Sequence, residues 1–226
     1  MSNSDRLRQT AASIGGGRGI FNKDALYHEI GMQKSVSKLI PLLKTEYPNS
    51  EFIWKKRLTK REIAAKVNPK VTYNPEVEKS FISPDGGVLF VKYEGEEYPC
   101  KYLPILISEA KKQGTNVKRL DEGLKKQSKG NAIERAFKNI EEFKLYCKDL
   151  NYFPYVIFAC GCDFGSGSSI LDRLDAMTGY EPRNVNYVAD SKQKVTIYIQ
   201  EDYFTANEIF DKIYDVAKTS LKCIGM

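Results

Sequence analysis

The spacing of apolar residues predicts three long helices. Residues 131–150 show the clearest pattern, because their apolar side chains recur at the three- and four-residue intervals of one helix face. An earlier helix is expected to start after an N-cap at Asn22 and to run to about Lys44, with Pro41 bending or dividing it. A closing helix is expected over residues 205–221.

Two shorter helices complete the helical pattern. One is expected from Thr59 to Asn68, because Thr59 and Glu62 have the spacing of a capping box and Pro69 follows. The other is expected over residues 168–177.

Short apolar runs between the helices predict strands. Residues 103–110 and 155–160 are nearly continuous apolar runs, as expected for strands buried on both faces of a sheet. Residues 88–93 alternate, and shorter strands are expected at residues 51–54, 80–83, 185–188 and 195–199. This succession of helices and strands predicts a single α/β domain over residues 1–226, with a mixed central sheet.

The charge balance points to a polyanionic partner without identifying one. The formal net charge is +6, and the basic side chains gather in two clusters. A phosphate backbone favours such clusters because binding releases counterions, whereas the alternative is a solvated basic face. The clusters are Lys55, Lys56, Arg57, Lys60 and Arg61, and Lys118, Arg119, Lys125, Lys126 and Lys129. Residues 1–18, with Arg6, Arg8 and Arg18, are expected to form a flexible basic arm.

The cysteine and histidine content excludes several kinds of site. His28 is the single histidine, so a zinc site with two histidines is impossible. Cys160-Gly161-Cys162 lacks the second ligand pair of a zinc ribbon, and the five cysteines are expected to be reduced thiols of a cytoplasmic protein. No apolar run reaches the roughly 18 residues of a membrane span, so no membrane segment is expected.

One group of polar residues is expected at the end of a buried strand. Glu109 and Lys111 stand two positions apart and therefore project to the same face, where a neighbouring strand can bring Asp85 beside them. Asp85 and Glu109 would supply hard oxygen ligands for Mg²⁺, and the Ala110 carbonyl can add another. Such a metal acidifies bound water for phosphodiester hydrolysis, while Lys111 stabilises developing charge or helps to orient and deprotonate the water.

This signal has an alternative explanation. An acid two residues before a lysine recurs in the chain, at Glu142-Phe143-Lys144 and at Asp190-Ser191-Lys192. Only Glu109-Ala110-Lys111 ends a buried strand preceded by a Pro-Asp pair. A salt-bridged strand end without catalysis is the other interpretation.

A second group opens the helix predicted over residues 131–150. Gly130 allows close backbone approach, and the helix N-terminus at Asn131 suits a phosphate. Asn131, Glu134 and Arg135 offer donors and acceptors suited to base edges in a DNA groove. Ordinary helix capping with a surface ion pair explains the same residues.

These two groups together resemble the EcoRI family of restriction endonucleases. The likeness follows most of the chain in order, so it is more specific than either motif alone. The matching segments are residues 19–21, 36–39, 46–48, 84–87, 109–111, 113–114, 130–135, 138–140, 153–156, 171–175 and 219–221.

The resemblance implies a fold and an activity. The fold would be the PD-(D/E)xK nuclease core, a mixed five-stranded central sheet flanked by helices. The protein would be a homodimer that cuts both strands of a palindromic double-stranded DNA site with Mg²⁺, for which Mn²⁺ would substitute, and leaves 5′ overhangs. Asp85 and Glu109 carry over as metal ligands and Lys111 as the catalytic lysine, with no small-molecule cofactor.

The resemblance also implies a recognition sequence with an AATT centre. Asn131, Glu134 and Arg135 match residues that contact the central adenines, and Ala132 and Gln113 match positions near the thymines. Residues expected at the DNA backbone are Arg18, Lys129 and Gly130.

The outer base pair is expected to be read differently. The family pattern has Met-Ala-Ala where this chain has Gln127-Ser128-Lys129, and it has two arginines where this chain keeps Arg173 but has Ala176. A lost bidentate contact costs roughly 1–3 kcal/mol of discrimination. The site is therefore expected to be GAATTC or a relaxed form, such as purine-AATT-pyrimidine or bare AATT.

Other function classes stay open from the sequence. A structure-specific DNA repair nuclease would share the fold and ignore AATT. A catalytically silent sequence-specific DNA-binding protein would use the acidic residues only as an ion-pair network. An RNA-binding module is less favoured, because no paired aromatic stacking motif is visible.

Overall fold

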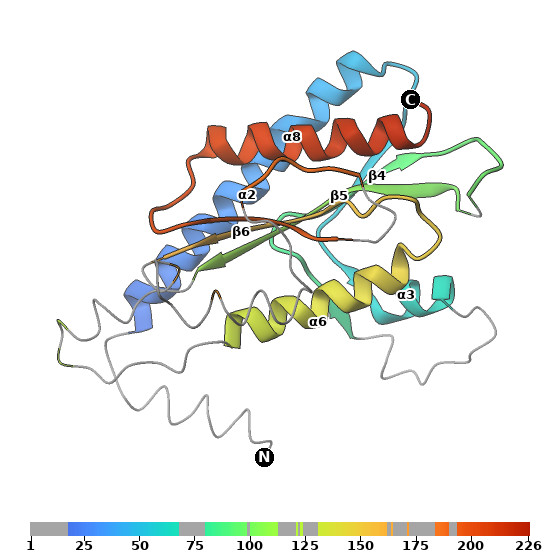
Figure 1. Ribbon diagram of the computed structural model, residues 1–226. Coiled ribbons are helices and arrows are strands. Elements are labelled where there is room, and N and C mark those ends of the chain that lie inside the picture. Colours follow the sequence, from blue (N-terminus) through green and yellow to red (C-terminus); the bar gives the residue numbers. More distant parts are fainter. Residues whose placement is uncertain are drawn as a thin grey trace.

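A mixed five-stranded sheet forms the centre of the computed structural model (Figure 1). The structure describes residues 18–67, 80–98, 100–112, 121, 123, 131–161, 164, 171, 184–189 and 194–226, with the side chains of 18–26, 67 and 131–135 left out. The strands, in spatial order, are β1 (Phe52–Lys55), β4 (Gly87–Lys92), β5 (Tyr102–Lys112), β6 (Tyr155–Cys160) and β7 (Thr196–Gln200). The predicted α/β fold with a mixed central sheet is confirmed.

Strand directions divide this sheet into two halves. β4 runs antiparallel to both of its neighbours, β1 and β5, whereas β5, β6 and β7 run parallel. β5 is therefore the central strand and has hydrogen-bonded neighbours on both sides. Its residues from Leu103 to Glu109 are buried, which matches the nearly continuous apolar run in the sequence. A second, two-stranded sheet pairs β2 (Leu58–Thr59) with β3 (Phe81–Ile82).

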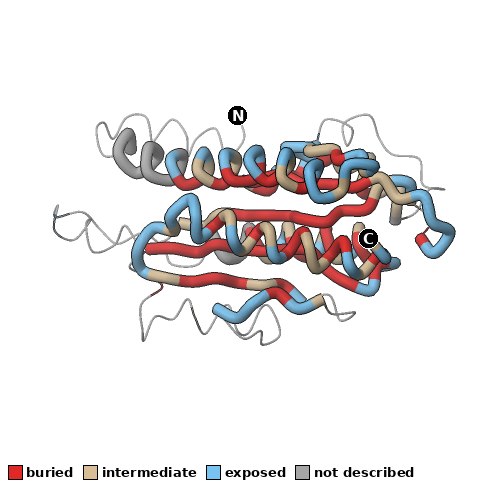
Figure 2. The backbone as a smooth tube through the Cα atoms, turned by 90° about the horizontal axis from the view of Figure 1, so that it is seen from above, coloured by how far each residue is buried: buried red, intermediate tan, exposed pale blue. Residues whose placement is uncertain are grey.

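Helices cover both faces of the large sheet. α2 (Arg18–Glu46) and α8 (Ala206–Cys223) lie on one face, and α3 (Lys60–Val67) and α6 (Asn131–Tyr146) lie on the other (Figure 1). In the view onto α2 and α8, each helix alternates buried and exposed positions while the strands beneath are buried along most of their length (Figure 2). The buried positions of α2 are Met32, Val36, Leu39 and Leu43, at helical spacing.

The course of α2 differs from the sequence-based prediction in two respects. α2 begins at Arg18, before the expected N-cap at Asn22, so Arg18 belongs to this helix and not to an N-terminal arm. α2 also continues through Pro41 to Glu46 without dividing. Its apolar stripe of Val36, Leu39 and Leu43 packs in the core on both sides of the proline, and this burial offsets the lost backbone hydrogen bond.

The other predicted elements are present in the described part of the chain with one exception, although α6 ends at Tyr146 and not at residue 150. The capping box at the start of α3 forms, since the Thr59 hydroxyl accepts from the Glu62 N–H at 3.1 Å and the Glu62 carboxylate accepts from the Thr59 N–H at 2.7 Å. Residues 185–188 were expected to form a strand and do not. The edge of β7 beside them is satisfied instead by the Asn184 amide, which bonds both the N–H and the carbonyl of Ile199. The helix predicted over residues 168–177 lies largely outside the described residues.

The described cysteines carry no disulfide. Cys147 and Cys160 are buried, and Cys100 and Cys223 are half-buried thiols. Burial raises the pKa of Cys160 to about 11 against the opposing charge of Lys112, so this thiol is protonated at neutral pH. The expectation of reduced cysteines therefore holds for the described part of the chain, and Cys162 lies outside it. None of the helices in the described ranges has the long apolar stretch that crossing a bilayer requires.

Candidate active site

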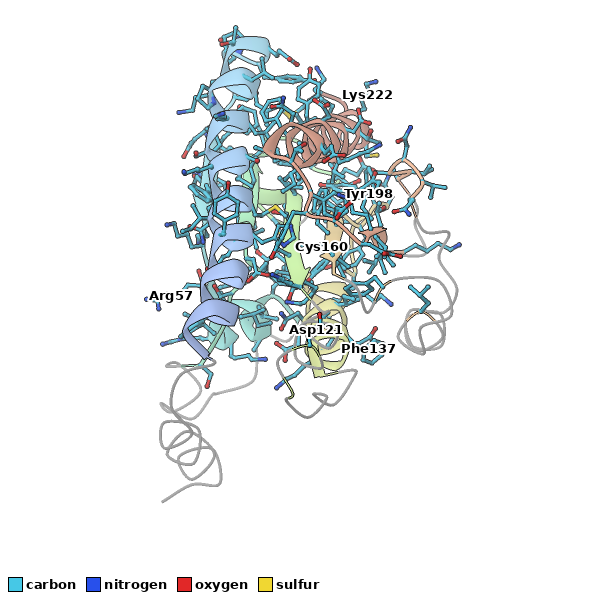
Figure 3. All side chains as sticks on the ribbon, turned by 90° about the vertical axis from the view of Figure 1, so that its left-hand side faces the viewer. Arg57, Asp121, Phe137, Cys160, Tyr198 and Lys222 are labelled. Carbon is cyan, nitrogen blue, oxygen red and sulfur yellow. The ribbon has the colours of Figure 1, made fainter. Side chains whose placement is uncertain are left out.

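The carboxyl end of β5 brings the predicted catalytic residues together. Glu109 and Lys111 lie on the same face of this strand, and their charged groups form an ion pair. The Lys111 ammonium also lies 3.6 Å from the Asp85 carboxylate. The left-hand end of the molecule in Figure 1, which faces the viewer in Figure 3, holds this end of β5 together with the first turns of α2 and α6.

Asp85 is held in place by a tight turn before β4. The Gly87 N–H donates to the Pro84 carbonyl at 2.8 Å, and the Gly86 N–H donates to the Ser108 carbonyl of β5 at 2.9 Å. Gly87 has a φ of 74°, a conformation that residues with a Cβ rarely adopt. The turn therefore joins the start of β4 directly to β5 and presents the Asp85 side chain to the end of that strand.

A backbone hydrogen bond fixes the Asp85 side chain. Its carboxylate accepts from the Ala110 N–H at 3.0 Å. Asp85 thus lies beside the backbone of the residue between Glu109 and Lys111, as the sequence predicted. Burial and then the charge of Asp85 raise the pKa of Glu29 in α2. The Asp85 charge therefore acts on a second carboxyl group, on α2.

Glu109 is almost completely buried, with 1% of its surface exposed. A buried carboxylate needs compensating donors, since its unsolvated charge is costly. The Asn139 amide of α6 donates to it at 3.1 Å, and the Tyr155 hydroxyl of β6 donates to its other oxygen. Together with Lys111, these groups come from three different elements of the fold.

Lys111 carries its positive charge between the two carboxylates. Burial by itself would lower the pKa of Lys111, but the charges of Glu109 and Asp85 outweigh it and raise the pKa above its ordinary value. The lysine is therefore a cation at neutral pH in this arrangement. A protonated ammonium can stabilise negative charge on a phosphate, and it cannot accept a proton from water.

The two carboxylates and the Ala110 backbone form a small donor set suited to a divalent ion. The Lys111 ammonium pairs with both Asp85 and Glu109, so one cation already lies between the two carboxylates. In the described part of the chain, no cluster of three or more His, Cys, Asp or Glu side chains could hold a metal. A sparse oxygen set of this kind fits Mg²⁺, which keeps several waters in its shell and adds substrate phosphate oxygens.

The predicted base-reading residues are placed only in part. Asn131, Ala132, Glu134 and Arg135 occupy the first five positions of α6, so they stand at a helix N-terminus as expected. Their side chains lie outside the described residues, as do Gln113, Lys129, Gly130 and Arg173. Arg18, expected at the DNA backbone, begins α2, and its side chain is likewise outside them.

Several side chains of the first basic cluster form ion pairs or ring contacts with neighbouring side chains. Lys55 pairs with Glu62 at 2.8 Å, and Lys60 pairs with Glu142 of α6. The Arg57 guanidinium lies 4.9 Å from the centre of the Phe81 ring. These contacts favour a structural role for part of this cluster. The second cluster, at residues 118–129, lies outside the described residues.

Sequence reasoning gave no role to two residues that contact the site. Asn139 and Tyr155 both fall in segments that matched the family pattern, yet neither carries a recognisable catalytic motif. Each lies far along the chain from Glu109, by 30 and 46 residues respectively. Glu29 was also missed, and its position in an amphipathic helix gave no sign that the charge of Asp85 acts on it.

Comparisons with known proteins identify the family to which the chain belongs. The family described as "Restriction endonuclease EcoRI" matches residues 14–180. The type II restriction enzyme RsrI of Cereibacter sphaeroides is 29% identical over 252 aligned residues, covering 93% of this chain and 90% of the relative. The type II restriction enzyme EcoRI of Escherichia coli is 31% identical over 268 aligned residues, covering 98% of this chain and 94% of the relative. The chain therefore belongs to the EcoRI family of restriction endonucleases and is a type II site-specific deoxyribonuclease.

Proposed function

We propose that this enzyme hydrolyses phosphodiester bonds in a palindromic double-stranded DNA site with an AATT centre, using Mg²⁺ and leaving 5′ overhangs. The observation that carries the proposed chemistry is the convergence of Asp85, Glu109 and Lys111 at the end of β5. The AATT centre rests on the likeness of the residues at the start of α6 to the family pattern.

The metal would be held by the Asp85 and Glu109 carboxylates and by the Ala110 carbonyl. When bound there, Mg²⁺ would lower the pKa of a water ligand and offset the charge that develops on the phosphate. Mn²⁺ has a similar preference for oxygen ligands and should substitute. No small-molecule cofactor is proposed.

The chain's own groups would orient and stabilise the reacting phosphate. The Lys111 ammonium would lie against the phosphate oxygens, where its charge stabilises the transition state. The Ala110 N–H would keep the Asp85 carboxylate pointed at the site through its 3.0 Å hydrogen bond. Glu109 is 1% exposed, so its carboxylate has little contact with bulk water.

The start of α6 would read the inner bases. Asn131, Glu134 and Arg135 would contact the adenines, and Ala132 and Gln113 would lie near the thymines. Arg173 is the outer-pair residue that this chain shares with the family pattern, and Ala176 replaces the second arginine. We therefore propose GAATTC or a relaxed site such as purine-AATT-pyrimidine.

A homodimer would present the same contacts to each half of the palindrome. Arg18, Lys129 and Gly130 would contact the DNA backbone, where a positive or open backbone surface suits a phosphate. The enzyme would act in a bacterial cytoplasm, where invading DNA is met; the relatives named above are bacterial.

Digestion of a fully sequenced plasmid tests this proposal. Purified enzyme with Mg²⁺ is expected to give fragment ends that all lie within AATT-centred sites, and the flanking bases report the outer-pair preference. The Lys111→Ala variant, purified in parallel, controls for contaminating nucleases. Ends scattered over other sequences would contradict AATT recognition and favour a nuclease that reads DNA structure. Specific binding without any Mg²⁺-dependent ends would contradict the catalytic assignment.

A further inference from the structure

The Glu109 carboxylate is oriented by more than its pairing with Lys111. Two side chains outside the Asp-Glu-Lys set, Asn139 and Tyr155, donate hydrogen bonds to it. They come from α6 and β6, two elements that both follow Glu109 in the sequence. Asp85 differs, because its described contacts are the Ala110 N–H and the Lys111 ammonium.

The Asn139 amide spans both oxygens of the carboxylate. Its nitrogen lies 3.1 Å from Oε1 and 3.4 Å from Oε2 of Glu109. A single donor group placed across both oxygens restricts rotation of the carboxylate plane. The side chain of Glu109 is thus fixed in direction before any ligand reaches it.

The Tyr155 hydroxyl contacts the second oxygen of the Glu109 carboxylate. It donates to Glu109 Oε2 from a fully buried ring on β6. Oε2 therefore keeps one strong partner while Oε1 faces Lys111.

We propose that Asn139 is a positioning residue which, with Tyr155, holds the Glu109 carboxylate in the orientation that binds the catalytic metal. This inference rests on the proposed function, in which Glu109 is a metal ligand. Hydrogen-bond partners of a ligating carboxylate set its direction and basicity, and removing one typically costs 10–100-fold in metal affinity or activity.

Packing alone does not require an amide at this position. The core-facing residues of α6 are Ala136, Ile140 and Phe143, and Asn139 lies beside that stripe, only partly buried. A leucine of similar shape would fill the same space without donating. The Asn139→Leu variant therefore separates the two roles, because it keeps volume and removes the hydrogen bonds.

Two measurements on Asn139→Leu test the inference. The first is single-turnover cleavage of an AATT duplex over a series of Mg²⁺ concentrations. The second is Mn²⁺ binding to the protein by isothermal titration calorimetry, which needs no turnover. We expect the Mg²⁺ concentration for half-maximal rate and the Mn²⁺ Kd to rise about 10–100-fold, with metal-free DNA binding unchanged. Asn139→Gln, which retains the amide donor, should recover part of the loss.

Glu141→Ala is the matched control on the same helix. Glu141 is exposed and pairs with Lys144 at 3.1 Å on the surface. Its removal should leave the Mg²⁺ dependence and the Mn²⁺ affinity near those of the wild type. If Asn139→Leu does not fold, Tyr155→Phe carries the test, since it deletes one oxygen and should weaken Mn²⁺ binding in the same direction.

Distinct results would overturn the inference or the function beneath it. A loss of rate in Asn139→Leu that is equal at every Mg²⁺ concentration, with Mn²⁺ affinity like that of Glu141→Ala, would reject the positioning role. Wild-type protein that binds Mn²⁺ without cutting DNA would reject the proposed function and leave the positioning role standing if Asn139→Leu binds Mn²⁺ more weakly. Wild-type protein that binds no Mn²⁺ would reject both.

Discussion

The two faces of the β5 carboxyl end use buried polar groups in opposite ways. On the α6 face, Glu109 is buried and receives hydrogen bonds from several donors, and Lys111 pairs with it. On the α2 and α8 face, His28 is 3% exposed and stacks on Phe204, with ring centroids 6.3 Å apart. The His28 Nε2 finds no hydrogen-bond partner within the described residues.

The two faces differ in whether their buried polar groups are charged. Burial lowers the pKa of His28, against the opposing charge of Asp85, so the imidazole is neutral and acts as a packing group. Its Nδ1 lies 3.7 Å from the Cys160 sulfur, at the end of β6 labelled in Figure 3. The Glu109 face instead keeps full charges close together and supplies each with partners. The Glu109 face thus brings together the carboxylates and the lysine that the proposed phosphodiester hydrolysis would use.

Adjacent lysines on β5 give the largest expected contrast. Lys111→Ala should lower cleavage by about 10³-fold or more, because the charge that stabilises the phosphate is lost. DNA binding should be largely retained. Lys112→Ala, on the opposite face, removes a contact with the Tyr203 ring at 4.4 Å and should lower cleavage far less. Single-turnover cleavage and gel-shift assays on both variants measure this contrast.

Equal activity loss in the two lysine variants would break the comparison between the faces. It would mean that cleavage depends on the total charge at the strand end and not on the position of the Lys111 ammonium. A Lys111→Ala enzyme that turns over near the wild-type rate would remove this lysine from the mechanism.

Gly87→Ala should have the next largest effect, through the turn that holds Asp85. An added Cβ would meet the Lys55 carbonyl at 2.6 Å, and the φ of 74° strains any residue with a side chain. We expect a loss of about 1–3 kcal/mol in unfolding free energy, measured by urea denaturation. Cleavage should fall as well, because Asp85 shifts relative to β5.

Gly225→Ala is the control for the glycine prediction. Gly225 has a φ of 77° and nothing within 4 Å of an added Cβ, and it lies near the carboxyl end of the chain. It should lose less stability than Gly87→Ala and keep its cleavage rate. Loss of activity in both variants would show that backbone strain in general, and not the Asp85 turn, limits the enzyme.

The smallest expected effect is the contribution of His28 to the pH dependence of folding stability. Because the folded pKa of His28 lies below its ordinary value of 6.5, the unfolded chain binds its proton more readily. Stability from this group is therefore present above the ordinary pKa and declines as pH falls through it. Thermal melts from pH 7.5 to 5 should show a steeper fall for the wild type than for His28→Phe. Parallel curves would show that His28 does not contribute.

Local pattern was sufficient to predict the elements that carry the proposed catalytic residues. The apolar run before Glu109 predicted a buried strand, and the two-residue period placed Glu109 and Lys111 on one face. Both predictions hold because strand alternation and burial depend on neighbouring residues. The strand predicted over residues 185–188 shows the limit of local pattern, because it does not form. The Asn184 side chain instead bonds the β7 edge at Ile199, a contact that neighbouring residues do not predict.

Long-range packing decided what surrounds Glu109. Asn139 and Tyr155 reach this carboxylate across 30 and 46 residues, after α6 has packed on the sheet and β6 has paired in parallel register with β5. An asparagine on a helix and a tyrosine on a strand occur in many structural roles, so neither residue by itself predicts such a contact. The sequence by itself determined the charged groups, their strand and the family. Only the tertiary structure decided which neutral donors hold the buried carboxylate, because those partners depend on register and packing angle rather than on local spacing.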